Sequence, residues 1–230
     1  MKVAKVSVLL TSYNRDKLLN GAIQSVLTNG YENYHLYITD DDSENPKTHE
    51  VLNSYIDHPN VTVFKNKLNG VDRYSRNGYA TNLNKILVEL KSTETKYVTY
   101  LTCDDIYLPG RLKRMARQLD QNSSQYVVYG VQRIVKLHPN LSTSLIALRN
   151  AGLVVAKAAC QVDHCSVMHR IECVQETKFD FWPPHRGSIG AGDAALWIKL
   201  NKKWPFYRLA DSLDPTDEHR LHKNSIQKLG

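Results

Sequence analysis

The chain has 230 residues, and its 30 Lys and Arg residues against 23 Asp and Glu residues give a formal net charge of +7 at pH 7. A hydrophobic fraction of 42% argues against intrinsic disorder, and this length is typical of one domain, so we expect residues 1–230 to form a single domain. No run approaches the ~18 apolar residues of a membrane span. The first apolar run, Val6 to Leu10, is too short for a signal peptide, which predicts a cytoplasmic protein.

The four cysteines form no CxxC pair, which favours reduced thiols over a zinc site or a disulfide framework. The positive charge fits either nucleic acid or phosphorylated small molecules as partners. Because the basic residues are scattered along the chain and no nucleic-acid-binding motif accompanies them, we expect no nucleic-acid partner.

The first half of the chain alternates between strand-like and helix-like patterns. A β-branched run at 5–10 predicts a strand, and the apolar spacing over 18–27 predicts a helix that stops before Gly30. A strand at 35–39 follows, and then a helix opened by Pro46.

The same alternation continues to about residue 130. Strands are predicted at 61–64, 97–101 and 126–130, with a helix at 80–90 and another opened by Pro109. Strands that alternate with helices of this length indicate βαβ crossovers, so we expect an α/β fold with a mostly parallel central sheet and helices on both faces.

The second half is less regular. Short strand-like runs lie at 131–137 and 162–168, and a helix is predicted at 194–201. Residues 216–230 are polar and predict a mobile tail. Within that tail, Arg220, His222 and Lys223 would either close over a bound diphosphate or remain disordered.

Three polar segments directly follow predicted strands: Thr11–Asn14, Asp40–Ser43 and Cys103–Asp105. Ligands of open parallel sheets bind at the carboxyl ends of the strands, so these segments predict one shared site. Their five carboxylates would repel one another without a nearby cation or hydrogen-bond donors. A divalent ion such as Mn²⁺ or Mg²⁺, which binds carboxylate and phosphate oxygens, would complete such a site.

Several other phosphate and cation sites are excluded. The chain contains no GxxxxGK[ST] loop and no GxGxxG segment after a strand, which excludes P-loop NTPases and dinucleotide-binding folds of the usual kind. The segment that begins at Asp40 lacks the spacing of a calcium-binding EF-hand loop.

The ordered set of segments 6–15, 38–43, 101–109, 162–170 and 204–207 resembles a family 2 glycosyltransferase with the GT-A fold. The similarity extends from about Lys5 to Asp214. It implies a Rossmann-like fold in which residues 1–130 form the nucleotide-sugar-binding half. Residues 131–215 would then supply the acceptor-binding half and the catalytic base.

The resemblance also implies roles for individual residues on the nucleotide side. Tyr13 would stack on a pyrimidine base, Thr11 would hydrogen-bond beside it, and Asp41 would accept from the base N3–H. Uracil and thymine share that N–H, so the donor would be a UDP- or dTDP-sugar. Arg73 aligns with an arginine on the same side.

The resemblance assigns the metal and the base to two further segments. Thr102 stands in place of the first Asp of the usual D-x-D-D pattern, Cys103 occupies the ribose-contacting position, and Asp104 keeps the metal position as the single strong protein ligand. Asp193 corresponds to the family's catalytic base and is also placed to be the N-cap of the 194–201 helix.

The sequence therefore predicts a metal-assisted, inverting glycosyltransferase that uses Mn²⁺ or Mg²⁺. It would move a sugar from a UDP- or dTDP-sugar to a hydroxyl of a polysaccharide or glycoconjugate acceptor. Two alternatives remain open: a sugar-nucleotide-binding protein without transfer activity, and a sugar-phosphate nucleotidyltransferase. For the latter, the Thr-Ser-Tyr-Asn loop at residue 11 lacks the expected glycines and basic residue.

Overall fold

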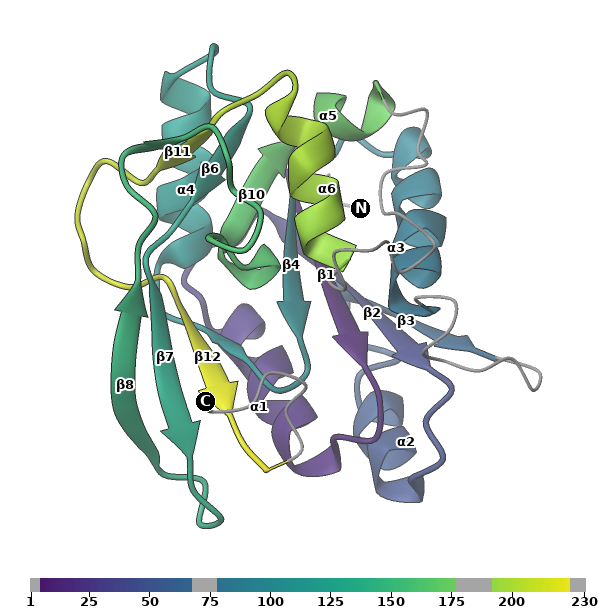
Figure 1. The fold of residues 1–230 in the computed structure, drawn as a ribbon. Helices are drawn as coiled ribbons and strands as arrows, with labels where there is room; N and C mark the ends of the chain where they lie inside the picture. The colour runs from purple at the N-terminus through teal and green to yellow at the C-terminus, as the bar shows by residue number, and fades with distance from the viewer. Residues whose placement is uncertain (1–4, 68–77, 177–191, 224–230) are drawn as a thin grey trace.

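The computed structural model describes residues 5–67, 78–176 and 192–223 (Figure 1). Its main sheet has the strand order β3-β2-β1-β4-β10-β6-β11-β9. The bounds are β1 Val6–Ser12, β2 Tyr34–Asp41, β3 Val61–Asn66, β4 Tyr97–Thr102, β6 Val127–Tyr129, β9 Val154–Val155, β10 Val167–Arg170 and β11 Phe206–Arg208.

The first half of the chain builds the parallel part of this sheet. Strand β1 pairs in parallel with both β2 and β4, and β2 pairs in parallel with β3. Strand β10 inserts antiparallel to β4 and β6, and β9 lies antiparallel to β11 at the far edge. The expected α/β class with a mostly parallel central sheet is confirmed.

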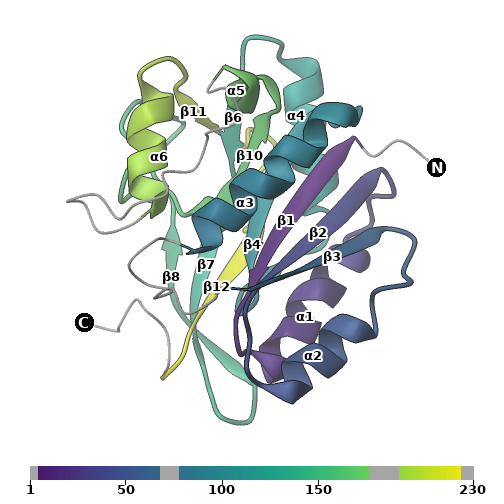
Figure 2. The same cartoon turned by 90° about the vertical axis from the view of Figure 1, so that its right-hand side faces the viewer.

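Helices cover both faces of the sheet, as predicted (Figure 2). Apolar side chains of α1, α2 and α4 pack on one face in a core with β1 and β2. Those of α3, α5 and α6 pack on the other face. The helix bounds are α1 Asp16–Leu27, α2 Pro46–Asn53, α3 Gly78–Glu89, α4 Arg111–Gln121, α5 Glu172–Gln175 and α6 Gly192–Asn201, with short 3₁₀ turns η1 Leu90–Ser92 and η2 His164–Ser166.

A second, four-stranded sheet contains residues that the sequence analysis expected to be mobile. Its order is β5-β12-β7-β8, with bounds β5 Ile106–Tyr107, β7 Gln132–Leu137, β8 Thr143–Arg149 and β12 Asp217–Leu221. Strand β12 pairs in parallel with β7, and Thr216, Asp217 and Glu218 are buried. The prediction of a mobile tail from residue 216 is therefore wrong for 216–221.

Polar contacts and one close backbone approach hold β12 in place. A Cβ atom at Gly130 would lie 1.8 Å from Thr216 Oγ1, so only glycine fits beside the start of this strand. The buried Asp217 carboxylate accepts from Gln132 Nε2 at 2.6 Å and lies 3.8 Å from Arg111 Nε. Because these stabilising groups are polar, the segment carries little of the apolar alternation that marks a strand.

Smaller differences concern element boundaries. Asp40 and Asp41 belong to the end of β2 rather than to the following loop. The 162–168 run divides into η2 and the start of β10. Pro46 opens α2 as expected, and Gly30, just beyond α1, has a φ of 77° that suits glycine.

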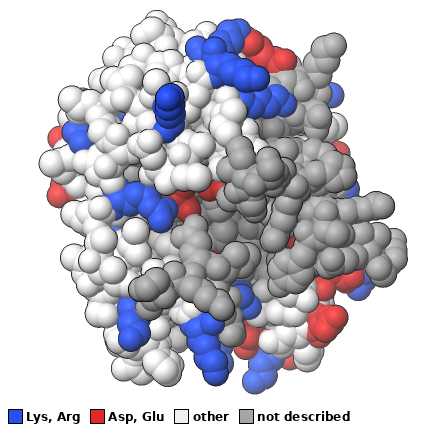
Figure 3. All heavy atoms as spheres, viewed as in Figure 1, with Lys and Arg blue, Asp and Glu red and all other residues white. Residues whose placement is uncertain are grey.

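The structure bears on three features considered from composition: membrane spans, the state of the cysteines and the distribution of basic residues. Within the described residues, no helix is both long and apolar enough to span a membrane. All four cysteines are free thiols, and only Cys160 is exposed. On the face drawn in Figure 3, Lys and Arg side chains lie in separate groups.

Candidate functional site

The register of the parallel strands brings the three predicted polar segments to one edge of the sheet. Thr11 of β1 pairs with Thr39 of β2 on one side and with Thr102 of β4 on the other. The residues that follow these threonines therefore lie side by side, as the carboxyl-edge argument predicted.

The expected nucleotide-side residues surround the end of β1. Thr11 and Tyr13 are half-buried, and the Thr11 carbonyl accepts the N–H of Cys103 at 3.0 Å. Asp41 is buried and accepts from Asn82 Nδ2 of α3 at 3.0 Å. Burial, reinforced by Asp104, raises the pKa of the Cys103 thiol to about 12, so the thiol stays neutral.

The Asp40–Asp42 carboxylates each have protein partners of their own. Asp40 accepts from the Ser43 hydroxyl at 2.6 Å and from the Ser43 N–H at 2.9 Å. Asp42 Oδ1 lies 3.0 Å from Lys67 Nζ. These hydrogen-bond donors and this lysine offset the repulsion expected among the acidic segments, without a metal at β2.

The side chain of Asp104 is a carboxylate, a group that can bind a metal ion. Residues from near both ends of the chain lie next to it. His222, directly after β12, places Nε2 3.1 Å from Asp104 Oδ2, and Arg15 Nε lies 4.0 Å from the same oxygen. The carboxylate is one-quarter exposed and therefore reachable by a ligand. A carboxylate beside an imidazole suits Mn²⁺ well, because manganese accepts oxygen ligands and also tolerates imidazole nitrogen.

Asp105 ties β12 to the same loop. Its carboxylate accepts from Thr102 Oγ1 at 3.0 Å, from the Arg220 N–H at 2.9 Å, and lies 3.0 Å from His219 Nδ1. Burial disfavours a charged His219 ring, but Asp105 outweighs that effect and raises the pKa of His219 to about 9. Asp105 thus holds β12 in place, and β12 in turn positions His222 next to Asp104.

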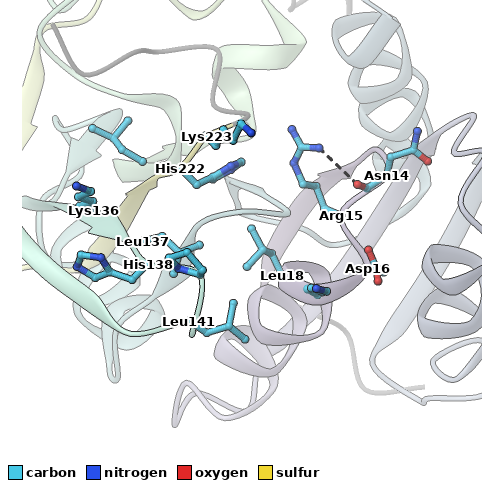
Figure 4. Close-up of a pocket in the computed structure, with 13 residues that line it drawn as sticks. Asn14, Arg15, Asp16, Leu18, Lys136, Leu137, His138, Leu141, His222 and Lys223 are labelled. Atoms are coloured by element: carbon cyan, nitrogen blue, oxygen red, sulfur yellow. Dashed lines mark hydrogen bonds between the residues drawn. The ribbon is translucent and has the colours of Figure 1, made fainter.

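A cavity of about 680 Å³ is lined by Arg15 and His222 (Figure 4), the two residues that also lie next to Asp104. The start of α1, the end of β7 and the end of β12 form its walls. Basic side chains line it together with several leucines, the basic ones being Arg15, Lys17, Lys136, His138, His222 and Lys223. This lining favours an anionic group in the cavity.

Asp193 lies in the first turn of α6 and is 23% exposed. It is the second residue of the helix, so the N-cap prediction is off by one or two positions. Its Oδ1 accepts the N–H of Ala194 at 2.9 Å, and its Oδ2 lies 3.8 Å from His164 Nδ1.

A row of contacts links Asp193 to the strand edge. His164 Nε2 lies 3.7 Å from Cys165 Sγ, and that sulfur lies 3.7 Å from Thr102 Oγ1 at the end of β4. Asp193 is therefore separated from the Asp104 loop by only a few side chains, although the two residues are far apart in sequence.

Asp163, His164 and Cys165 also bring three ligand-type atoms within 4.8 Å of one another. Asp163 Oδ1 accepts the Cys165 N–H at 2.9 Å, and its Oδ2 lies 3.5 Å from Arg149. Burial also raises the pKa of the Cys165 thiol well above its ordinary value. Because Asp163 is already engaged by these partners, we favour Asp104 over this cluster as the metal position.

Arg73, the remaining predicted site residue, lies outside the described residues. Sequence reasoning missed the contacts of Asn82 with Asp41 and of His164 with Asp193. It also left the role of His222 open. The adjacent His164 and Cys165 were a visible signal in the sequence, but no further residue at the spacing of a zinc site accompanies them.

Comparisons with known proteins agree on one family and one fold. The family model "Glycosyl transferase family 2" matches residues 7–151. The chain is 34% identical over 215 residues to "Protein CgeD" of Bacillus subtilis (strain 168), which covers 92% of this chain and 50% of that protein. The chain thus spans half the length of this relative.

Two solved structures share the fold. The S. aureus TarS 1-349 structure in complex with UDP-GlcNAc superposes with a TM-score of 0.69 at 16% identity, over 96% of this chain and 60% of that chain. Mannosyltransferase PcManGT from Pyrobaculum calidifontis, in complex with GDP-Man and Mn²⁺, gives a TM-score of 0.66 at 14% identity, over 96% and 58%.

Proposed function

Because the chain belongs to glycosyl transferase family 2 and has the GT-A fold, we propose that it is an inverting, metal-assisted glycosyltransferase. It moves a sugar from a UDP- or dTDP-linked donor to a hydroxyl of a polysaccharide or glycoconjugate acceptor. The observation that carries the proposal is the row of contacts from Asp193 through His164 and Cys165 to Thr102, which puts a partly exposed carboxylate close to the Asp104 loop.

The nucleotide half of the donor lies at the end of β1. Tyr13 offers a ring face for stacking, Thr11 a hydroxyl, and Asp41 a carboxylate that accepts the base N3–H. Asn82 holds Asp41 through its side-chain amide, which orients the carboxylate before the nucleotide binds. A base that offers an N–H at this position, uracil or thymine, is favoured over one that offers only an acceptor.

The diphosphate lies next to Asp104. Asp104 and His222 would hold Mn²⁺ or Mg²⁺ there, and the bound ion would offset the negative charge that develops on the leaving diphosphate. Arg15, with Nε 4.0 Å from Asp104, adds a positive charge on the same side. The basic side chains of the adjoining cavity contribute to the same field.

Asp193 acts on the acceptor. Its carboxylate accepts the proton of the acceptor hydroxyl as that oxygen bonds to the anomeric carbon and the bond from that carbon to the diphosphate oxygen breaks. The nucleoside diphosphate leaves from the opposite face, so a single displacement inverts the anomeric centre.

A binding and turnover screen tests the proposal. Purified protein is melted with UDP-, dTDP- and GDP-sugars, with and without Mn²⁺, and the stabilising donor is then assayed for release of nucleoside diphosphate. A donor at about 100 times its Kd stabilises the folded state by about 2.7 kcal/mol, which raises Tm by roughly 5–10 °C. Metal-dependent stabilisation with turnover supports the proposal. Binding without turnover to any acceptor would instead indicate a sugar-nucleotide-binding protein.

A further inference from the structure

The ring of His164 lies between two carboxylates that come from different parts of the chain. Its Nδ1 is 3.8 Å from Asp163 Oδ1 and 3.8 Å from Asp193 Oδ2. The ring is 19% exposed, so solvent screens these two contacts only in part. Two carboxylates at this distance from one nitrogen favour a positively charged ring.

Asp163, the other carboxylate beside the ring, is held in place by two contacts of its own. Its Oδ1 accepts the Cys165 N–H and thereby caps η2, while its Oδ2 lies 3.5 Å from Arg149 at the end of β8. Charges therefore alternate along a row of Arg149, Asp163, His164 and Asp193. Asp193 is the last member of this row and the one on the predicted acceptor side.

The row constrains both oxygens of the Asp193 carboxylate. Oδ1 is engaged by the Ala194 N–H at 2.9 Å, and Oδ2 faces His164. These two contacts orient the carboxylate plane and, among the described residues, leave its other lone pairs for an acceptor hydroxyl.

From this arrangement we propose that His164 is a positioning residue for Asp193, and that it acts as an imidazolium which orients the Asp193 carboxylate. The inference rests on the proposed function of Asp193 as base, and it adds a residue to which neither the motifs nor the family resemblance gave a role. Asp163 anchors the imidazolium, and Arg149 anchors Asp163.

The groups that face the ring agree with this charge state. Among the described residues they include Asp163 from its own loop, Asp193 from α6, Tyr79 from α3 and the neighbouring Cys165. Burial disfavours the charged ring, yet the two carboxylates outweigh it and raise the pKa of His164 to about 10.

The first arm of the test follows the ring directly and needs no substrate. The imidazole resonance of His164, identified by its absence in His164→Gln, is followed by NMR between pH 5.5 and 9 in the wild type and in Asp193→Asn. We expect no titration below about pH 8 in the wild type, and a midpoint lower by about one unit or more in Asp193→Asn. A wild-type ring that titrates near its ordinary pKa of about 6.5 overturns the proposal.

The second arm follows turnover of the donor found in the binding screen, with water or a glycoside as acceptor. In His164→Gln we expect kcat to fall by about 10-fold or more, with donor affinity unchanged, because the carboxylate is no longer held in position. His164→Lys, which keeps a cation, should restore kcat partly. The matched control is His58→Gln, a loop histidine whose Nδ1 accepts the Asn60 N–H, and it should leave kcat unchanged.

The outcomes separate this inference from the proposed function. If Asp193→Asn is inactive while His164→Gln keeps the wild-type kcat, the His164 proposal fails and the base assignment stands. If Asp193→Asn retains full turnover, the base assignment fails and the positioning role falls with it. Thermal melting of His164→Gln and His164→Lys separates loss of folding from loss of function.

Discussion

His222 Nε2 lies 3.1 Å from Asp104 Oδ2, although 118 positions separate the two residues in the chain. Strand β12 positions His222, the residue that follows it. The pairing of β12 with β5 and β7 returns the chain to the Asp104 loop. The resemblance implied one strong protein ligand at the metal position, and the fold supplies a second donor atom beside it. The pair provides one carboxylate oxygen and one imidazole nitrogen on the same side of the predicted diphosphate.

Removal of either member of this pair should weaken metal-dependent nucleotide binding. We expect Asp104→Ala to abolish the effect of Mn²⁺ on UDP affinity, since no other carboxylate of the loop points to the same position: Asp105 is committed to His219 and Arg220. For His222→Ala we expect a loss of about 10–100-fold in apparent metal affinity. Calorimetric titration of UDP over a range of Mn²⁺ concentrations measures both effects.

A matched control is available in the same cavity. His138 lines the cavity, and its Nε2 lies 3.0 Å from Ser144 Oγ rather than near Asp104. His138→Ala should therefore leave the Mn²⁺ dependence unchanged. Equal losses in His138→Ala and His222→Ala would assign the effect to the charge of the cavity as a whole and remove His222 from the metal site.

Asp193→Asn should separate binding from chemistry. The substitution keeps the size of the side chain and its contact with the Ala194 N–H but removes the proton acceptor. We expect turnover to fall by about 10²–10⁴-fold with nearly unchanged donor affinity. Steady-state kinetics together with donor titration measure the two quantities separately, and normal turnover would rule out Asp193 as the base.

The strand edge that holds the nucleotide side was predictable, because short-range patterns determine it. Each strand from β1 to β4 is an apolar run that ends in a polar segment, and parallel strands bring such ends together. Thr11 and Thr102 are therefore neighbours by register alone. The family resemblance then added roles that spacing could not supply.

The other half of the site depended on tertiary packing. Strand β12 has the sequence Asp-Glu-His-Arg-Leu, and the buried partners of its polar side chains come from Arg111 and Gln132, which are distant in sequence. The contact between His164 and Asp193 likewise depends on where α6 packs against η2. Hydrophobic periodicity carries no information about such polar pairs.

Arg111 should be a large single contributor to stability. Its fully buried guanidinium donates to Thr99 Oγ1 at 3.1 Å and to the Cys165 carbonyl, lies 3.8 Å from Asp217, and stacks 3.9 Å from the centre of the Tyr107 ring. Arg111→Ala leaves the buried Asp217 without its positive partner, and we expect a loss of about 3–5 kcal/mol in the free energy of unfolding. Urea denaturation measures this loss.

The double variant Arg111→Met with Asp217→Asn tests the reason for that loss. It removes both charges, so the uncompensated carboxylate is no longer buried, and we expect it to recover part of the stability. If the double variant is as unstable as Arg111→Ala, the loss reflects packing around α4 rather than the buried charge.

His169 should make stability depend on pH in the acidic range. Its Nδ1 lies 2.9 Å from the Arg170 carbonyl and therefore carries the proton, so Nε2 accepts from the Tyr100 hydroxyl at 2.7 Å. This arrangement needs a neutral ring, and burial lowers the pKa of His169 to about 4. Because the folded pKa lies below the unfolded value of about 6.5, the contribution is complete above pH 6.5 and is lost as the pH falls towards 4. The total is of the order of 3 kcal/mol. In His169→Gln, the slope of unfolding free energy against pH between 6.5 and 4 should be shallower than in the wild type by about one proton. Equal slopes would mean that the ring is already charged in the folded state.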